Sequence, residues 1–297
     1  MPRQSRMTAA RAPSTWLGTT ALLTAITMLA FAANSLLARL ALQTTPIDPA
    51  TFTATRLITG ALTLALILRW QGHRLDTSRT GWLSALLLFV YAAGFSYAYR
   101  GLNTGTGALL LFAAAQLLMI GAGRLRGERT NLWGAALALL GLVLFLAPGG
   151  HAHQPVQLGH AALMLMAGLA WGGFSLLGKA QQSPVVGTAS SFVLAIPLAV
   201  LLLGAQHAHL QPDGLGLGYA AVSGCLTSAL GYVLWYWVRV RMSATLAGTV
   251  QLSVPVISAL MGMAWLAETM SPGKMLAGGL VLLGVGLTVR KPQPRSP

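Results

Sequence analysis

Ten long runs of apolar residues, each about twenty residues in length, alternate with short polar breaks along the chain. A helix that crosses the hydrocarbon core of a bilayer, about 30 Å thick, needs about 20 mostly apolar residues. The runs lie at 17–40, 50–68, 81–99, 105–123, 131–147, 159–178, 185–204, 215–238, 244–266 and 273–289. This pattern predicts an all-α membrane protein with ten transmembrane helices.

The composition agrees with a chain that lies mostly within a bilayer. Of its 297 residues, 55% are hydrophobic and 8% are charged, whereas about 25% charged residues are usual in soluble domains. The single cysteine, Cys225, lies inside an apolar run and excludes both an intramolecular disulfide and a cysteine-rich metal cage. No nucleotide-binding GxxxxGK[ST] run and no HExxH motif occurs. We therefore expect no enzyme and no cofactor.

The basic residues are placed asymmetrically across the ten predicted spans. With the N-terminus in the cytoplasm, only Arg39, Arg100 and Lys274 of the nineteen Lys and Arg residues fall on the outer side, and Arg56 lies within a span. An excess of Lys and Arg in cytoplasmic loops is typical of membrane proteins. The net charge of +14 is thus explained as loop charge, and nucleic acid is not an expected partner. We predict a multi-pass protein of the cytoplasmic (inner) membrane with both termini in the cytoplasm.

The two halves of the chain match each other at an offset of about 140 residues. Four sets of positions follow in the same order: 29–40 with 169–180, including Arg39 with Lys179; Tyr97 and Arg100 with Tyr236 and Arg239; Glu128 with Glu268; and 137–144 with 280–287. Because each half would hold five spans, the second must enter the membrane from the opposite side, an arrangement typical of secondary transporters. The predicted division is a tail at 1–14, repeats at 15–149 and 150–290, and a tail at 291–297.

Several local features mark these spans. They are Phe31-Ala32-Ala33 and Trp171-Gly172-Gly173-Phe174 in the first helix of each half, Arg56 in the second span, the Pro-containing run 251–268, and the acidic residues Glu128 and Glu268. With these features the chain, from about residue 15 to 290, resembles the EamA-type ten-helix exporters of the drug/metabolite transporter superfamily. The resemblance implies an inner-membrane carrier that exports small metabolites such as amino acids. The halves are not interchangeable, since Gln116 stands opposite Pro255 and Asn34 opposite Phe174.

Arg56 is a basic residue that falls well inside a predicted span. It lies about six residues into that span, or about 9 Å deep at 1.5 Å per residue. A charge at such depth must face protein, water or the membrane interface. A guanidinium can bind a substrate carboxylate through two parallel hydrogen bonds. It can also extend outward to the interface or hold a structural hydrogen-bond network, and the sequence leaves these alternatives open.

Aromatic residues recur on one face of the third and eighth spans. Tyr91, Phe95 and Tyr99 are spaced i, i+4, i+8, and Tyr232, Trp235 and Arg239 are spaced i, i+3, i+7, so each set shares a helix face. Such faces can line a solute cavity. Interfacial belts explain aromatic residues near span ends more simply, an interpretation that we favour for Tyr97, Tyr99, Tyr236 and Trp237. Tyr91, Tyr232 and Trp171 lie deeper.

Uncharged polar residues near the middle of spans complete the candidate site. Such groups need partners within the membrane, and they can contact solute or join neighbouring helices. Pro255 frees a backbone carbonyl and bends its helix, so it is a candidate hinge. The predicted substrate-binding residues are Asn34, Arg56, Tyr91, Tyr99, Gln116, Trp171, Tyr232, Trp235, Gln251 and Ser253.

The function predicted from the sequence is export of a small metabolite, such as an amino acid or a related amphipathic solute, by alternating access. The protein would act as a monomer or homodimer in the lipid bilayer. One alternative is a transition-metal exporter that uses the histidines of the outer loops, which include two His-X-His pairs. No Cys or carboxylate cluster accompanies them except Asp213, so no metal site is predicted. A membrane-embedded protein without transport activity is the other alternative.

Energy coupling has few candidate residues. Proton-driven carriers usually keep an acidic residue or a histidine inside a span, but the five acidic residues fall at loops or at the end of a helix. A proton relay through carboxylates in the middle of the membrane is therefore not expected. Coupling through Glu268 stays open.

Overall fold

A computed structural model of the chain describes residues 14–125, 132–146, 157–178, 183–239, 241, 250–251 and 253–289. Every regular element in these ranges is helical. Seven helices are long and apolar enough to cross a membrane, and three shorter apolar helices, Ala136–Phe145, Ser253–Leu266 and Pro272–Gly284, accompany them. Together they correspond to the ten predicted spans, so the predicted fold class is confirmed.

The helices follow the order expected from the hydrophobic runs. The first half contains α1 (Ser14–Thr44), α2 (Pro49–Trp70), α3 (Arg79–Ala98), α4 (Thr104–Leu125) and α5 (Leu132–Leu146). The second half contains α6 (Leu158–Leu177), α7 (Pro184–Ala205), the short 3₁₀-helix η2 (His207–His209), α8 (Gly214–Val222), η3 (Ser223–Leu230), α9 (Gly231–Arg239), α11 (Ser253–Leu266) and α12 (Pro272–Val289). The eighth span is continuous through α8, η3 and α9, and η3 is a π-helix.

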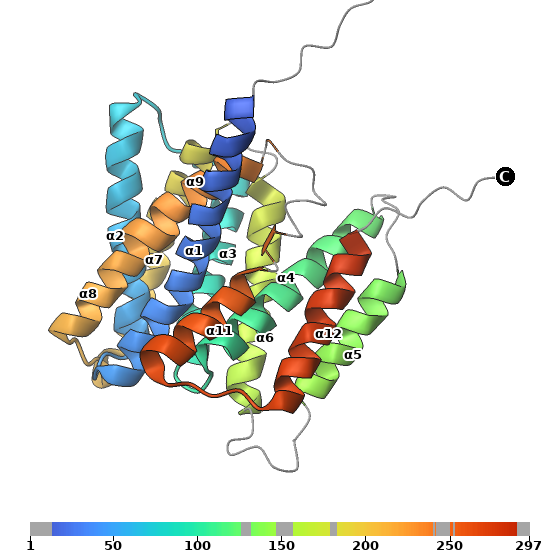
Figure 1. Cartoon of the computed structure of the whole chain (residues 1–297). Helices are drawn as coiled ribbons and strands as arrows, with labels where there is room; N and C mark the ends of the chain where they lie inside the picture. The colour runs from blue at the N-terminus through green and yellow to red at the C-terminus, as the bar shows by residue number, and fades with distance from the viewer. Residues whose placement is uncertain are drawn as a thin grey trace, which may run out of the picture.

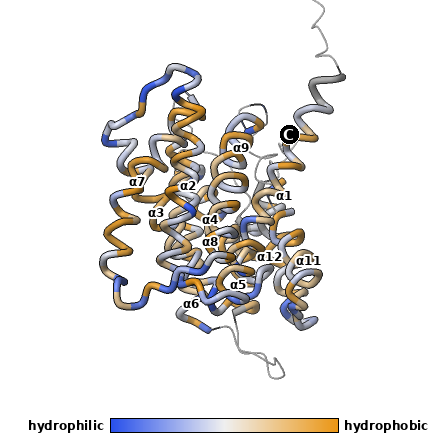
Figure 2. Tube along the Cα trace, turned by 90° about the vertical axis from the view of Figure 1, so that its left-hand side faces the viewer, coloured by the Kyte–Doolittle hydropathy of each residue, from blue (hydrophilic) through white to orange (hydrophobic). Residues whose placement is uncertain are grey.

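Two features of the bundle match an inverted arrangement of the halves. The described part of α1 begins at the top of Figure 1, whereas α6 begins at the bottom, so the two halves enter from opposite ends. The end of α12 lies at the same end as the start of α1. Figure 2 shows hydrophobic residues along the helices and hydrophilic residues gathered in turns at the ends.

Several helix contacts recur when each span is exchanged for the one five places away. The pairs α2–α7, α4–α11 and α5–α12 each join equivalent spans, α3–α6 has its counterpart in α1–α8, and α4–α6 has its counterpart in α1–α11. Two related halves facing each other would pack in this way. The boundaries 15–149 and 150–290 stay predictions.

The N-terminal end of α2 shows why this helix begins where it does. Asp48 accepts a hydrogen bond from the backbone N–H of Thr51 at 2.9 Å, and Pro49 occupies the first helical position. A side-chain acceptor before the helix and a proline at its start are common signals of a helix N-terminus. Arg56 is thereby placed two turns into α2.

The helix α1 differs from its predicted bounds. It continues to Thr44, beyond the predicted end at residue 40, because the residues after Arg39 remain apolar and continue the helix. Arg39 stood at the outer end of the predicted run 17–40. It lies within the last turns of α1 and is buried.

Candidate functional site

Arg56 on α2 lies in the centre of the bundle, where its side chain packs against α3 and the eighth span. The residue is only 1% exposed, so the prediction that it might extend outward to the interface is wrong. Its Nε donates to the hydroxyl of Ser228 at 3.0 Å, and its Nη2 donates to the hydroxyls of Tyr91 at 2.9 Å and Tyr232 at 3.2 Å. The guanidinium carbon also lies 4.8 Å from the ring centre of Phe95. The arginine is therefore held by neutral groups from two other spans, α3 and the eighth span.

The π-helix η3 brings hydroxyl groups onto the face of the eighth span that meets α1 and α2. Five residues of an α-helix turn through about 500°, which would place Ser228 about 140° away from Ser223. In a π-helix the hydrogen bonds run from i to i+5, so residues five apart lie roughly one above the other. Gly224 allows the close approach, because a Cβ at this position would collide with the carbonyl oxygen of Arg56.

Asn34 on α1 joins the same network. Its Oδ1 accepts hydrogen bonds from the hydroxyls of Ser223 at 2.7 Å and Thr227 at 3.1 Å. These two donors fix the amide so that its Nδ2 faces Tyr91, whose hydroxyl lies 3.3 Å away. The hydroxyl of Tyr232 lies 3.2 Å from that of Tyr91. We call Asn34, Arg56, Tyr91, Ser228 and Tyr232 the central polar cluster.

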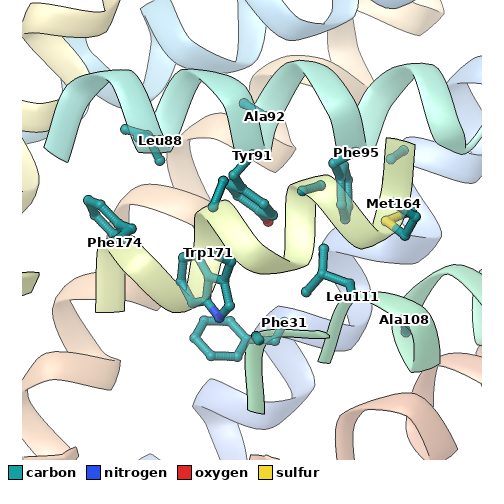
Figure 3. Packing of buried hydrophobic residues seen from close by; sticks show 14 of the residues in the cluster. Phe31, Leu88, Tyr91, Ala92, Phe95, Ala108, Leu111, Met164, Trp171 and Phe174 are labelled. Atoms are coloured by element: carbon teal, nitrogen blue, oxygen red, sulfur yellow. The ribbon is translucent and has the colours of Figure 1, made fainter. Parts of the chain in front are cut away.

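Aromatic side chains surround the central polar cluster. Figure 3 shows Trp171 on α6 between Tyr91 and Phe31. The ring centre of Trp171 lies 5.1 Å from that of Tyr91 and 4.9 Å from that of Tyr232. Phe31 on α1 also contacts Trp235, at 5.9 Å between ring centres. The deep aromatic residues predicted for the site therefore do lie together.

The central polar cluster contains more hydrogen-bond donors than acceptors. The Nη1 of Arg56 is buried without a hydrogen-bond partner, and so is the Nε1 of Trp171 in the adjoining aromatic shell. The oxygen of Tyr91 already faces the N–H groups of both Arg56 and Asn34. A buried donor without a partner costs about 1–3 kcal/mol, and more where it is charged. The arrangement thus favours a ligand that brings acceptor atoms and negative charge.

No acidic side chain among the described residues contacts Arg56. Asp48 binds the backbone N–H of Gln211, Asp76 that of Ser78, Asp213 that of Gly216, and Glu268 pairs with Arg39. The remaining acid, Glu128, lies outside the described residues, so the prediction concerning it has no structural outcome. Arg56 is thus a buried cation whose described neighbours are all neutral.

The other predicted polar residues and the candidate hinge lie on α4 and at the start of α11. Gln116 on α4 is buried, and its Nε2 has no hydrogen-bond partner. Gln251 is buried before α11, and the hydroxyl of Ser253 donates to the carbonyl of Val250 at 2.6 Å. Pro255 is the third residue of α11 as described and is buried. A role of these four residues in binding or bending stays a prediction.

Tyr99 and Tyr236 correct the prediction of an interfacial belt. Both are buried, with Tyr99 fully so. The ring of Tyr99 packs against Phe95 at 4.7 Å between centres, and its hydroxyl donates to the carbonyl of Thr104. Tyr99 is thus linked to Tyr91 through Phe95, as the i, i+4, i+8 spacing predicted, but it does not contact Arg56 directly.

A second buried arginine, which the sequence did not single out, lies near the end of α1. Arg39 Nε pairs with Glu268 Oε1 at 3.0 Å, across 229 residues of sequence. Its Nη1 donates to the carbonyls of Tyr99 at 2.8 Å and Arg100 at 3.3 Å. The other carboxylate oxygen of Glu268 accepts the backbone N–H of Thr104 at 2.7 Å. The available signal was that Arg39 and Glu268 each belong to a pair of positions matched between the two halves, Arg39 with Lys179 and Glu268 with Glu128.

The hydroxyls of the eighth span were also missed. Ser223, Thr227 and Ser228 interrupt an apolar run, and this was the signal for an internal polar face. Their separate contacts with α1 and α2 depend on the π-helix, which has no signature in the hydrophobic pattern. No group of three or more His, Cys, Asp or Glu side chains suited to a metal occurs among the described residues. His151 and His153 of the metal alternative lie outside those residues.

Comparisons with known proteins agree with this architecture. The EamA-like transporter family matches residues 158–290. A protein of Pseudomonas aeruginosa, described as uncharacterized, is 49% identical over 90% of this chain and 93% of its own length. The threonine/homoserine exporter RhtA of Escherichia coli is 31% identical over 80% of this chain and 82% of its own length. The uncharacterized transporter YwfM of Bacillus subtilis is 25% identical, over 83% and 86% respectively.

A solved crystal structure shares the fold. It aligns with a TM-score of 0.62 at 17% identity and covers 91% of this chain and 96% of its own. The ten apolar spans, the buried polar centre and the similarity to RhtA along most of both chains define a small-molecule transporter of the membrane. The chain belongs to the EamA-like transporter family of the drug/metabolite transporter superfamily.

Proposed function

We propose that this protein exports a small metabolite that carries a carboxylate, in the class of neutral amino acids, by alternating access. It acts in the inner membrane with both termini in the cytoplasm, as a monomer or a homodimer. The named activity of RhtA, export of threonine and homoserine, supports this class of substrate. Lys and Arg residues concentrated at one predicted face support the orientation.

The unpartnered Nη1 of Arg56 is the observation that carries the proposal. Nη1 carries two N–H groups that can donate to a carboxylate oxygen, and hydrogen bonds of this charge-assisted kind are about twice as strong as neutral ones. Tyr91 and Tyr232 hold Nη2 in place, so the free edge is oriented before the substrate arrives. The substrate carboxylate would then neutralise a buried charge that has no described acidic partner.

The aromatic shell suits the rest of such a substrate. Trp171 and Tyr232 present ring faces beside the cluster, with their centres 4.9 Å apart. Ring faces attract ammonium groups, most strongly those of Trp, and they also bury apolar side chains. No described acid is near to bind an ammonium, so we assign this group to the ring faces.

In this conformation the central polar cluster is sealed from solvent. Arg56, Tyr91, Trp171 and Tyr232 are all buried. A carrier must expose such a site to one side and then to the other. The structure supports a closed state between these two exposures, and the inverted packing of the halves supports the exchange.

The direct test is efflux from proteoliposomes loaded with labelled threonine, homoserine and other neutral amino acids. We expect saturable efflux of at least one of them by the wild-type protein. Arg56→Gln should reduce that efflux by about 10-fold to 150-fold, because hydrogen bonds to charged groups contribute about 1.5–3 kcal/mol. Amides of the same amino acids, which lack the carboxylate, should not compete.

The matched control is Arg69→Gln in the last turn of the same helix, where the arginine is exposed. This variant should transport at the wild-type rate. Equal competition by an amino acid and its amide would show that the carboxylate is not recognised. Full efflux by a folded Arg56→Gln protein would have the same consequence.

A further inference from the structure

We propose that Arg39 and Glu268 form the gate that closes the predicted outer side of this transporter. The inference rests on the alternating access proposed above, but it uses a different part of the molecule. The pair joins the end of α1, the turn between α3 and α4, and the turn between α11 and α12. The first two segments belong to the first half of the chain and the third belongs to the second half.

The position of the pair fits a gate. Asn34 of the central polar cluster and Arg39 lie on the same helix, about 7.5 Å apart along its axis at 1.5 Å per residue. The turn between α11 and α12 lies at the bottom of Figure 1, the end opposite the start of α1. Tyr99 is buried next to the pair, because Arg39 donates a hydrogen bond to the backbone carbonyl of Tyr99. A solute leaving the centre toward this end must pass these side chains.

An unusual backbone conformation just before Glu268 positions its side chain beside Arg39. After α11 ends at Leu266, Ala267 adopts a φ of +50°, the only described non-glycine residue with a positive φ. The N–H of Glu268 then donates to the carbonyl of Gly262 at 3.2 Å. A Cβ on Gly262 would collide with the Glu268 carboxylate. Non-glycine residues in this region of φ are strained, and they cluster at switches and functional sites.

The carboxylate makes contacts with both neighbouring segments of the first half. Oε1 pairs with Arg39, and Oε2 accepts the N–H of Thr104 at the first residue of α4. A negative charge at a helix N-terminus is stabilised by the helix dipole and by free N–H groups. Neutralising Glu268 would weaken both contacts, so one side chain holds the second half against two segments of the first.

The pair is also placed so that it can open. The side chains of Arg39 and Glu268 are each 11% exposed, which leaves them at the edge of water and not in the deep interior. When the segments separate, water can solvate both charges, whereas a fully buried pair would have to break without it.

The experiment measures water access from outside and needs no substrate. Ser35 on α1 lies between Asn34 and Arg39 in the sequence and is 2% exposed. In full-length protein with Cys225→Ser and Ser35→Cys, the introduced thiol is the sole cysteine. We would treat right-side-out vesicles with a membrane-impermeant methanethiosulfonate and follow the rate of labelling.

Glu268→Gln and Arg39→Gln should each raise the labelling rate at least tenfold, which corresponds to about 1.4 kcal/mol toward the open state. Arg39→Lys keeps the charge and should label more slowly than Arg39→Gln. The matched control is Asp213→Asn, since Asp213 also caps a helix, α8, with its carboxylate but does not contact Arg39. It should label at the rate of the parent protein.

Unchanged labelling in both Gln variants, with the folded state verified by size-exclusion chromatography, would overturn the gate. Faster labelling only from inside-out vesicles would overturn its assignment to the outer side. A failure of carboxylate recognition in the efflux assay would leave the labelling result unaffected. The two proposals can therefore fail separately.

Discussion

Two buried arginines on neighbouring helices have opposite surroundings. Arg39 on α1 pairs with Glu268 and donates to two carbonyls. Arg56 on α2 contacts only neutral hydroxyls and ring faces, and its Nη1 has no hydrogen-bond partner. The protein itself supplies the counter-ion in one case. In the other, no described residue does.

This difference distinguishes the role proposed for Arg39, which closes the bundle, from the role proposed for Arg56, which binds the substrate. A buried charge without a partner destabilises the folded protein, so it persists where a ligand completes it. A paired charge at the edge of water instead joins segments and can be released. Two arginines in one bundle therefore have different functions. Both are buried, so the partners of each arginine distinguish the two functions.

The strongest test of this contrast is one conservative substitution made at both positions. Lysine keeps the charge but cannot reproduce the planar, forked geometry of a guanidinium. Arg56→Lys should lower saturable efflux by about 10-fold to 100-fold, because it loses two or more charge-assisted hydrogen bonds. Arg39→Lys should change efflux by less than about threefold, since a single ion pair can still form. Similar losses in both variants would remove the distinction.

The next largest effect concerns the π-helix that holds Arg56. Gly224→Ala would force the eighth span away from the Arg56 carbonyl and Thr59. Overpacking of this kind costs about 1–3 kcal/mol, and we expect a lower unfolding temperature together with reduced efflux. Gly218→Ala on the same span is the control, because no atom lies within 4 Å of the added Cβ. Equal stability of both variants would show that the close approach is not required.

The two tyrosines should differ in a smaller way. Tyr91 accepts from Arg56 at 2.9 Å and from Asn34, whereas Tyr232 lies 3.2 Å from Arg56 and makes no contact with Asn34. Tyr91→Phe should reduce efflux by about tenfold, the equivalent of about 1–1.5 kcal/mol for hydrogen bonds to a charged group. Tyr232→Phe should reduce it less. The reverse order in the efflux assay would contradict the assigned network.

The smallest expected effect concerns Asp48. Its carboxylate accepts hydrogen bonds from neutral donors, whereas Glu268 pairs with the charged Arg39. Burial alone would raise the pKa of Asp48, but hydrogen bonds from the Gln211 N–H and from Thr51 lower it below its usual range. The resulting stabilisation is present above the usual pKa of an aspartate and is lost as the pH falls through the lowered value. Asp48→Asn should therefore reduce stability by about 1 kcal/mol or less at pH 7.

Thermal unfolding in detergent at several pH values checks this prediction. The difference between wild type and Asp48→Asn should shrink as the pH is lowered below 4, the usual region for aspartate. A difference that stays constant with pH would mean that the charge of Asp48 does not contribute. Labelling of the Ser35→Cys reporter should not change in this variant, unlike in Glu268→Gln.

The sequence was sufficient for the spans and for much of the central polar cluster. Hydrophobic run length has a direct physical cause in the bilayer thickness, so the ten spans were predictable. Arg56, Tyr91 and Tyr232 stood out because polar groups deep in a span need partners. Their mutual contacts follow from packing between α2, α3 and α9, which the hydrophobic pattern does not encode.

The remaining features depend on contacts distant in sequence or on backbone detail. The pairing of Arg39 with Glu268 spans 229 residues, so the length of the hydrophobic runs could not reveal it. Tyr99 and Tyr236 resembled belt residues because they lie near helix ends, yet neighbouring segments cover them. Periodicity reports which face of a helix is apolar, but not what covers its ends.

The most direct measurement of the central claim is thermal unfolding of wild type, Arg39→Gln and Arg56→Gln, with and without amino acids and their amides. Without ligand, Arg39→Gln should unfold at a lower temperature than wild type, whereas Arg56→Gln should not, because it removes an unpaired buried charge. A carboxylate ligand should stabilise wild type and Arg39→Gln, and should not stabilise Arg56→Gln. Stabilisation of Arg56→Gln by the same ligand, to the same extent as wild type, would contradict the assignment of Arg56 as the carboxylate-binding residue.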